Sequence, residues 1–132
     1  MSRFVKNSEL VFKDIKILQK AMEAMGYGLT FSQEQELKLK GFYGKTKRVS
    51  ALVDFHKSVQ YDIGFVQENG AYQCVADWWG VNNEQRLNEK PFLVETMKNY
   101  AFIAAKETAP YGFTEQRRHE TEEEYVLELT SY

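Results

Sequence analysis

The sequence has few of the residues from which covalent or metal-based sites are built. Its 132 residues include one cysteine, two prolines and two histidines. The lone Cys74 excludes an internal disulfide and a cysteine-based zinc site, and His56 and His119 do not stand at a spacing typical of a metal site or a catalytic triad. We therefore expect no cofactor and no metal. The expected compartment is reducing, such as the cytoplasm.

Long apolar runs and segment boundaries are also missing. No window approaches the roughly 20 apolar residues of a membrane span, and the opening MSRFVKNSEL lacks the apolar core of a signal peptide. No repeat, low-complexity tract or flexible linker divides the chain. Phosphate-binding glycine motifs, a nucleophile elbow and H-E-x-x-H are likewise absent. We expect one domain over residues 1–132, without membrane insertion, and an enzyme is not the favoured class.

The chain is rich in aromatic residues, at 14%, and the stretch that organises it is residues 59–80, VQYDIGFVQENGAYQCVADWWG. Asn69-Gly70 is a strong signal for a two-residue hairpin turn. With that turn, Phe65 faces Cys74 and Ile63 faces Ala76. Cross-strand partners share a face of the sheet, so the pattern predicts a buried face, formed by Tyr61, Ile63, Phe65, Cys74, Ala76 and Trp78.

Two helices are expected to cover that face. Residues 13–25 carry apolar side chains at helical spacing, and Gly26 is placed to end the helix in a left-handed conformation. Residues 91–106 form the second predicted helix, with Pro91 in its first turn. Residues 81–89 are polar and predict a loop or a weak helical turn.

The remaining segments alternate between apolar and polar residues, as strands do. Besides the two strands of the hairpin, the pattern predicts strands at residues 3–5, 36–43, 49–56, 113–119 and 124–132. The order is then β-α-β-β-β-β-α-β-β. It indicates an α+β fold: one antiparallel sheet with two helices packed on one face. This order is similar to that of TATA-box-binding-protein-like and helix-grip sheets.

The first candidate site is a pair of carboxylates. In the predicted register Asp62 lies opposite Asp77, with Trp79 beyond it on the same outer face. Like charges directly opposite each other destabilise a sheet. The pair could share a proton, hold a divalent cation or receive a basic partner, or each aspartate could simply pair with a cation or cap a loop. An outward tryptophan is a typical interface anchor.

The second candidate site is basic. Lys38 and Lys40 lie on one face of the strand at residues 36–43, with Lys45, Lys47 and Arg48 after it. Basic side chains interleaved with aromatic ones on a sheet can bind RNA or single-stranded DNA. A solvated sheet face and turn explain the same pattern, and the chain as a whole is acidic, with a net charge of -2.

Several short segments resemble a known family. YDIGF at residues 61–65 and VADWWG at residues 75–80 are similar to signatures of the family of hypothetical chloroplast reading frame thirty-five, a domain of unknown function found in cyanobacteria and some plastids. MSRF, MGY at residues 25–27 and KGFYGKT at residues 40–46 are similar too, whereas the Glu-rich C-terminal hairpin departs from the family. The resemblance implies a protein of the cytoplasm or the plastid stroma. It implies no assigned activity, cofactor or catalytic residue.

These observations favour a non-enzymatic protein-binding or adaptor domain. It would act through the outer face of the central sheet, with Asp62, Asp77 and Trp79. The first alternative is a nucleic-acid-binding protein that uses the basic segment 38–48. The second is a small-ligand pocket or an enzyme site between the sheet and the helices. Another protein is thus the favoured partner ahead of nucleic acid, and the oligomeric state stays open.

Overall fold

A computed structural model of the chain describes residues 2–108. The strands are β1 (Val5–Phe12), β2 (Gly28–Phe31), β3 (Leu37–Lys40), β4 (Thr46–Val49), β5 (Ala51–Asp54), β6 (Ile63–Glu68) and β7 (Ala71–Ala76). The helices are α1 (Ile15–Ala24), α2 (Trp78–Gln85), α3 (Glu89–Thr108) and the short 3-10 helix η1 (Phe42–Gly44). The strands predicted at residues 113–119 and 124–132 lie outside the described residues.

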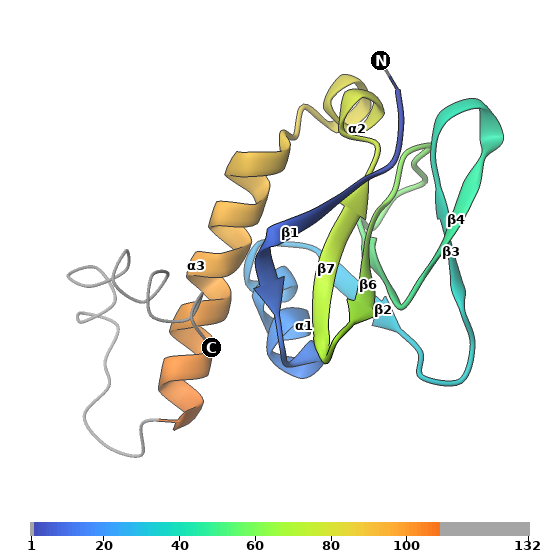
Figure 1. The fold of residues 1–132 in the computed structure, drawn as a ribbon. Coiled ribbons are helices and arrows are strands. Elements are labelled where there is room, and N and C mark those ends of the chain that lie inside the picture. The colour runs from blue at the N-terminus through green and yellow to red at the C-terminus, as the bar shows by residue number, and fades with distance from the viewer. Residues whose placement is uncertain (1, 109–132) are drawn as a thin grey trace.

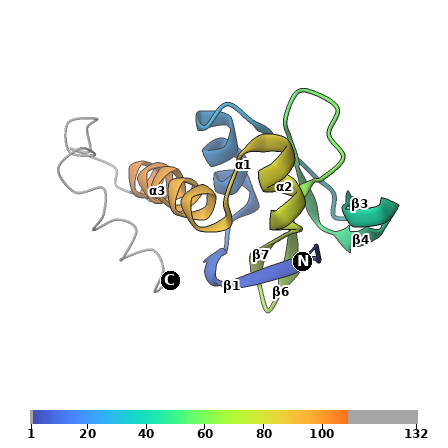
Figure 2. The same ribbon diagram turned by 90° about the horizontal axis from the view of Figure 1, so that it is seen from above.

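The described elements form three layers (Figures 1 and 2). Helices α1 and α3 lie on one side of a five-stranded antiparallel sheet, and the β3–β4 hairpin lies on the other side. The strand order in the central sheet is β1-β7-β6-β5-β2. The predicted α+β class and the antiparallel sheet with helices on one face are therefore confirmed. The predicted element order is wrong in detail: the first strand is Val5–Phe12 and not residues 3–5, and β2, α2 and the separate β3–β4 sheet are additional.

The central hairpin has the predicted register. Phe65 pairs with Cys74, and Ile63 pairs with Ala76. Asn69 and Gly70 both adopt positive φ, at 51° and 76°, as a type I′ turn requires. The predicted buried face is confirmed. Ile63, Phe65, Cys74 and Ala76 are fully buried, and the partly buried Tyr61 and Trp78 pack against the same cluster.

The two long helices pack on this face through the predicted stripes. The buried residues of α1 are Leu18, Ala21 and Met22, and α3 adds Leu93, Met97, Tyr100 and Ala104 to the same cluster. Asp14 caps α1, since its side chain accepts hydrogen bonds from the backbone N–H groups of Lys16 and Ile17. The same residue's N–H donates to the Tyr100 hydroxyl over 2.9 Å, which ties the start of α1 to α3.

The opposite face of the sheet is covered, which corrects the expectation of an open outer face. Leu39 of β3 and Val49 of β4 bury Val75 in a second apolar cluster. Gly64 lies under the same hairpin, where an added Cβ would come within 2.8 Å of the Ala51 carbonyl oxygen and 3.0 Å of Leu39. The sheet face is covered because residues 36–40 alternate between polar and apolar side chains. The alternation leaves Lys38 and Lys40 exposed, as predicted, and turns Leu37 and Leu39 toward the central sheet.

Some predicted strands have different limits. The segment at residues 49–56 is divided at Ser50, so that Val49 ends β4 on one side of the sheet while Ala51 and Val53 of β5 face the other. Residues 44–47 were expected to form a turn, but Thr46 and Lys47 already belong to β4. The predicted strand 36–43 ends at Lys40, because Tyr43 adopts a positive φ of 51° in η1.

The second strand of the central hairpin was expected to run to Gly80, and this was wrong. Strand β7 ends at Ala76, and Trp78 and Trp79 are the first two residues of helix α2. Their side chains still diverge, with Trp78 inward and Trp79 outward. The angle between them is set by a helix, in which consecutive residues are about 100° apart, and not by a strand.

Candidate functional site

Asp77 is the residue that turns strand β7 into helix α2. It has extended backbone angles, its carbonyl accepts the first helical hydrogen bond from Val81, and its Oδ1 accepts from the N–H of Gly80 over 3.3 Å. Ser2 donates its hydroxyl to the other carboxylate oxygen. Asp77 is only 1% exposed. Its carboxylate is thus used as an N-cap that also holds the N-terminal segment.

Replacement of Asp77 by Ala should therefore lower the free energy of unfolding by about 1–2 kcal/mol, the usual cost of losing an N-cap. Asp77→Asn should cost less, because an asparagine Oδ1 can cap the same helix. Urea denaturation of the two variants measures the difference. Equal stability of Asp77→Ala and the wild type would contradict the capping role.

Asp62, the other predicted carboxylate, is joined to a different element. It lies just before β6 and is 7% exposed. Its Oδ2 accepts a hydrogen bond from the backbone N–H of Lys40 over 2.8 Å, and its own N–H donates to the Lys40 carbonyl over 3.0 Å. Burial raises the pKa of Asp62 above its ordinary value, the Lys40 N–H and ammonium group oppose that rise, and Glu84 adds to it. Asp62 thus fixes the end of β3 to the central sheet.

The structure brings together residues that the sequence had assigned to two separate sites. The register that pairs Ile63 with Ala76 leaves Asp62 and Asp77 just beyond the paired residues. Each carboxylate accepts hydrogen bonds from its own donors, and these come from Lys40 in one case and from Ser2 and Gly80 in the other. Asp62 and Lys40, expected in different sites, are in direct contact.

Helix α2 is held against the segment before β6 by two further contacts. The carboxylate of Glu84 accepts hydrogen bonds from the backbone N–H groups of Gln60 and Tyr61, at 2.8–3.1 Å. The Tyr61 ring lies over Gly80, where it occupies the space that a Cβ would need. No pattern in the sequence marks Glu84 or Gly80 as site residues. The available signal was Asp77 itself, a preferred N-cap residue three positions before Gly80.

Trp79 is the exposed residue of this junction. The side chain is 56% exposed, although both neighbours in the chain pack inward. Trp78 contacts Phe92 with ring centroids 5.8 Å apart, and Gly80 contacts Tyr61. The Trp79 indole is therefore presented to solvent from a backbone that is fixed on both sides. We call Trp79 together with Asp77, Glu84 and Tyr61 the α2 junction.

The β3–β4 hairpin carries the predicted basic surface. Lys38 lies directly opposite Arg48 in the register, and Lys40 lies opposite Thr46. Arg48 forms an exposed ion pair with Glu36 at 3.1 Å, and the Lys40 ammonium donates to the Val59 carbonyl over 2.6 Å. At the hairpin tip Tyr43 is 94% exposed. The hairpin therefore offers cations and one exposed ring on the side away from the central sheet.

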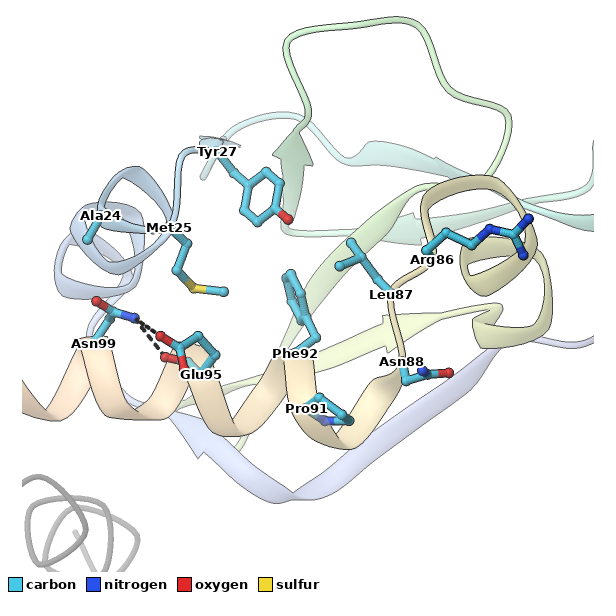
Figure 3. A pocket seen from close by; sticks show the side chains of 10 residues that line it. All are labelled: Ala24, Met25, Tyr27, Arg86, Leu87, Asn88, Pro91, Phe92, Glu95 and Asn99. Carbon is cyan, nitrogen blue, oxygen red and sulfur yellow. Dashed lines mark hydrogen bonds between the residues drawn. The ribbon is translucent and has the colours of Figure 1, made fainter.

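A pocket of about 520 Å³ lies between the C-terminal end of α1, the α2–α3 connection and α3 (Figure 3). The pocket is on the helical side of the domain but is bordered by helix ends, not enclosed between sheet and helices as the sequence alternative supposed. Its lining residues are Ala24, Met25, Tyr27, Arg86, Leu87, Asn88, Pro91, Phe92, Glu95 and Asn99.

Residues 2–108 offer little support for a thiol nucleophile, a metal site or a membrane span. Cys74 is fully buried, and burial raises the pKa of its thiol far above the ordinary value, so it behaves as a small core residue and not as a nucleophile. No group of three or more metal-ligating side chains occurs among these residues. The same residues include no helix that is both long and apolar enough to cross a membrane.

A family model matches most of the chain. Residues 21–129 match the model described as Protein of unknown function (DUF1257). Neither the search of curated proteins nor that of solved structures found a match. The similarity to TATA-box-binding-protein-like and helix-grip sheets therefore stays a prediction.

Proposed function

The chain belongs to the DUF1257 family, and from this premise we propose that it is a non-enzymatic protein-binding domain that acts through the α2 junction. The observation that carries the proposal is the exposure of Trp79 on a fixed helix. Tryptophan is highly buried on average, and it is enriched among the residues that dominate interface energies.

The surrounding contacts support the proposal because they reduce the cost of binding. Glu84 and the Asp77 cap fix both ends of α2. A side chain presented from a fixed backbone loses little additional conformational freedom when a partner covers it. In this reading Trp79 contacts the partner, while Asp62 and Asp77 are positioning residues that hold the two segments beside it.

Trp79→Ala tests the proposal directly. The variant should change the free energy of unfolding by less than about 0.5 kcal/mol, as usual for an exposed site. Its affinity for a partner should fall at least about 30-fold, the loss expected for a hot spot of about 2 kcal/mol. The matched control is Tyr43→Ala, which removes another strongly exposed ring.

The measurement is affinity capture from native lysate, with and without nuclease, followed by titration of the captured protein. We expect a protein that survives nuclease treatment and is lost with Trp79→Ala but retained with Tyr43→Ala. Capture that is unaffected by Trp79→Ala would refute the proposal.

A second candidate function, binding of RNA or single-stranded DNA by the β3–β4 hairpin, is favoured by one specific observation. Lys38 and Arg48 lie directly opposite each other, an arrangement that costs stability unless anions offset the repulsion. Exposed Tyr43 could stack on a base. Glu36 already offsets part of the charge of Arg48, which is why this function is second.

Salt dependence separates the two candidates. A nucleic-acid complex through the hairpin must weaken steeply as salt rises, because bound counterions are released, and simultaneous change of Lys38, Lys40 and Lys47 to Glu must abolish it. We expect no specific complex at physiological salt in a fluorescence-anisotropy titration. A sub-micromolar, salt-sensitive complex lost in the triple variant would make the hairpin the primary site.

We also propose that the chain is a member of the chloroplast reading frame thirty-five group, located in the cyanobacterial cytoplasm or the plastid stroma. The support is that the similar segments at residues 61–65 and 75–80 meet at the α2 junction. A fluorescent fusion should give a diffuse cytoplasmic or stromal signal. A signal confined to membranes would contradict the assignment.

A further inference from the structure

The pocket beside the α2–α3 connection has the size and walls of a ligand site. Its volume of about 520 Å³ falls within the usual range for small-molecule pockets, about 300–1,000 Å³. Met25, Tyr27, Leu87, Pro91 and Phe92 supply an apolar lining, and Figure 3 shows the rings of Tyr27 and Phe92 next to each other in it.

The two rings are held in place by second rings behind them. Tyr27 and Phe92 have centroids 6.1 Å apart at an interplanar angle of 45°. Phe55 supports Tyr27 at 5.4 Å, and Trp78 supports Phe92 at 5.8 Å. The aromatic wall therefore belongs to the rigid core and is formed before any ligand arrives, which lowers the entropic cost of binding.

The pocket lining also includes one carboxylate, that of Glu95. Glu95 is one helical turn after Phe92 and faces the same side of α3. The side-chain amide of Asn99 donates to the backbone carbonyl of Glu95 over 2.9 Å and to its carboxylate Oε1 over 3.4 Å, so the carboxylate points toward Asn99 (Figure 3). None of the ion pairs between described residues involves Glu95.

The other charged residue of the lining does not offset Glu95. Arg86 ends α2 in a left-handed conformation, with φ of 60°. Its guanidinium group points away from Tyr27 and Phe92, on the far side of the α2–α3 connection (Figure 3). The charge that a molecule in the pocket meets is therefore negative.

We propose that this pocket binds an organic cation, an ammonium or guanidinium group carried on a short apolar stem. The half-buried Tyr27, backed by the buried Phe92, presents a ring that attracts a cation. Glu95 supplies a charge-assisted hydrogen bond, and Met25 and Leu87 cover the stem. An anion would be repelled by Glu95, and a neutral apolar molecule would leave its charge without a cation, since the Asn99 amide that donates to it is uncharged. This site is independent of the α2 junction.

The test is a titration of the whole chain with phenethylammonium, followed by NMR of methionine methyl groups labelled with carbon-13. Met25 lines the pocket, whereas Met22 and Met97 are fully buried in the core and serve as internal references. We expect a saturable shift of the Met25 signal only. Glu95→Gln should weaken binding about tenfold, and Glu34→Gln, on the β2–β3 loop, should leave it unchanged.

The uncharged analogue 2-phenylethanol provides the decisive comparison. Binding of this alcohol as tightly as the ammonium would overturn the proposal, as would unchanged affinity of Glu95→Gln or no saturable shift with phenethylammonium. Capped lysine and arginine derivatives distinguish the source of the cation: tighter binding of these than of the free amine supports a side chain of a partner protein, and the reverse supports a free metabolite. Trp79→Ala should not alter the titration, so failure here leaves the α2 junction untouched.

Discussion

Leu39→Ala is expected to lower the free energy of unfolding by about 3 kcal/mol, within the range of about 2–5 kcal/mol for truncation of a buried leucine. Leu39 is fully buried and joins Val49 and Val75 in the cluster between the β3–β4 hairpin and the central sheet. The two-stranded hairpin has no other large buried core of its own in the described structure, and isolated hairpins are marginal in water. Urea denaturation measures the loss.

The control for this prediction is Leu37→Ala. Leu37 lies two residues away on the same strand face but is only partly buried, so its truncation should cost about 1 kcal/mol, since less apolar area is lost. If Leu39→Ala cost no more than Leu37→Ala, the hairpin would not be anchored through this cluster. Hydrogen exchange should also show faster opening of β3 and β4 than of β6 in Leu39→Ala.

The second large effect is expected at Gly80. A Cβ on this residue would lie 2.0 Å from two atoms of the Tyr61 ring, so Gly80→Val must displace either the ring or helix α2. We expect a loss of about 3 kcal/mol, at the upper end of the usual cost of overpacking. Val has a higher helix propensity than Gly, so the loss cannot be attributed to the helix itself.

Asn83→Val provides the matched control, because it places the same β-branched residue on the exposed side of α2. Its effect should stay below about 1 kcal/mol. Tyr61→Ala combined with Gly80→Val should be less destabilising than the sum of the two single changes, since the clash is then removed. Additive effects in this double-mutant cycle would show that Tyr61 is not the residue that Gly80 accommodates.

Separate hydrogen-bond donors explain how two aspartates can occur next to each other in the register. The Asp77 carboxylate accepts hydrogen bonds from the N–H of Gly80 and the hydroxyl of Ser2, and the Asp62 carboxylate accepts one from the N–H of Lys40. Hydrogen bonds from backbone N–H groups stabilise a buried carboxylate. The sequence pattern that suggested an open acidic site therefore also arises from two aspartates that accept structural hydrogen bonds.

The sequence alone was sufficient for the features that depend on local physics. Asn69-Gly70 determined the hairpin turn, because both residues must adopt positive φ, and the turn determined the register that buries Phe65 and Cys74. Apolar spacing identified α1 and α3, and Gly26 the end of α1. Alternation in residues 36–40 also predicted that Lys38 and Lys40 would be exposed.

Only the tertiary structure decided what covers each face and where strand β7 becomes a helix. The polar and glycine-containing segment after Asp77 has no strong helical period. Helix α2 therefore depends on its cap and on the contacts of its Glu84 and Gly80 with the segment at Gln60 and Tyr61, which is distant in the sequence. Leu39 could be identified as inward-facing from alternation, but alternation does not say which surface receives it. Packing between segments that are remote in the chain decides which surface receives Leu39. Periodicity within one segment carries no information about the segment that packs against it.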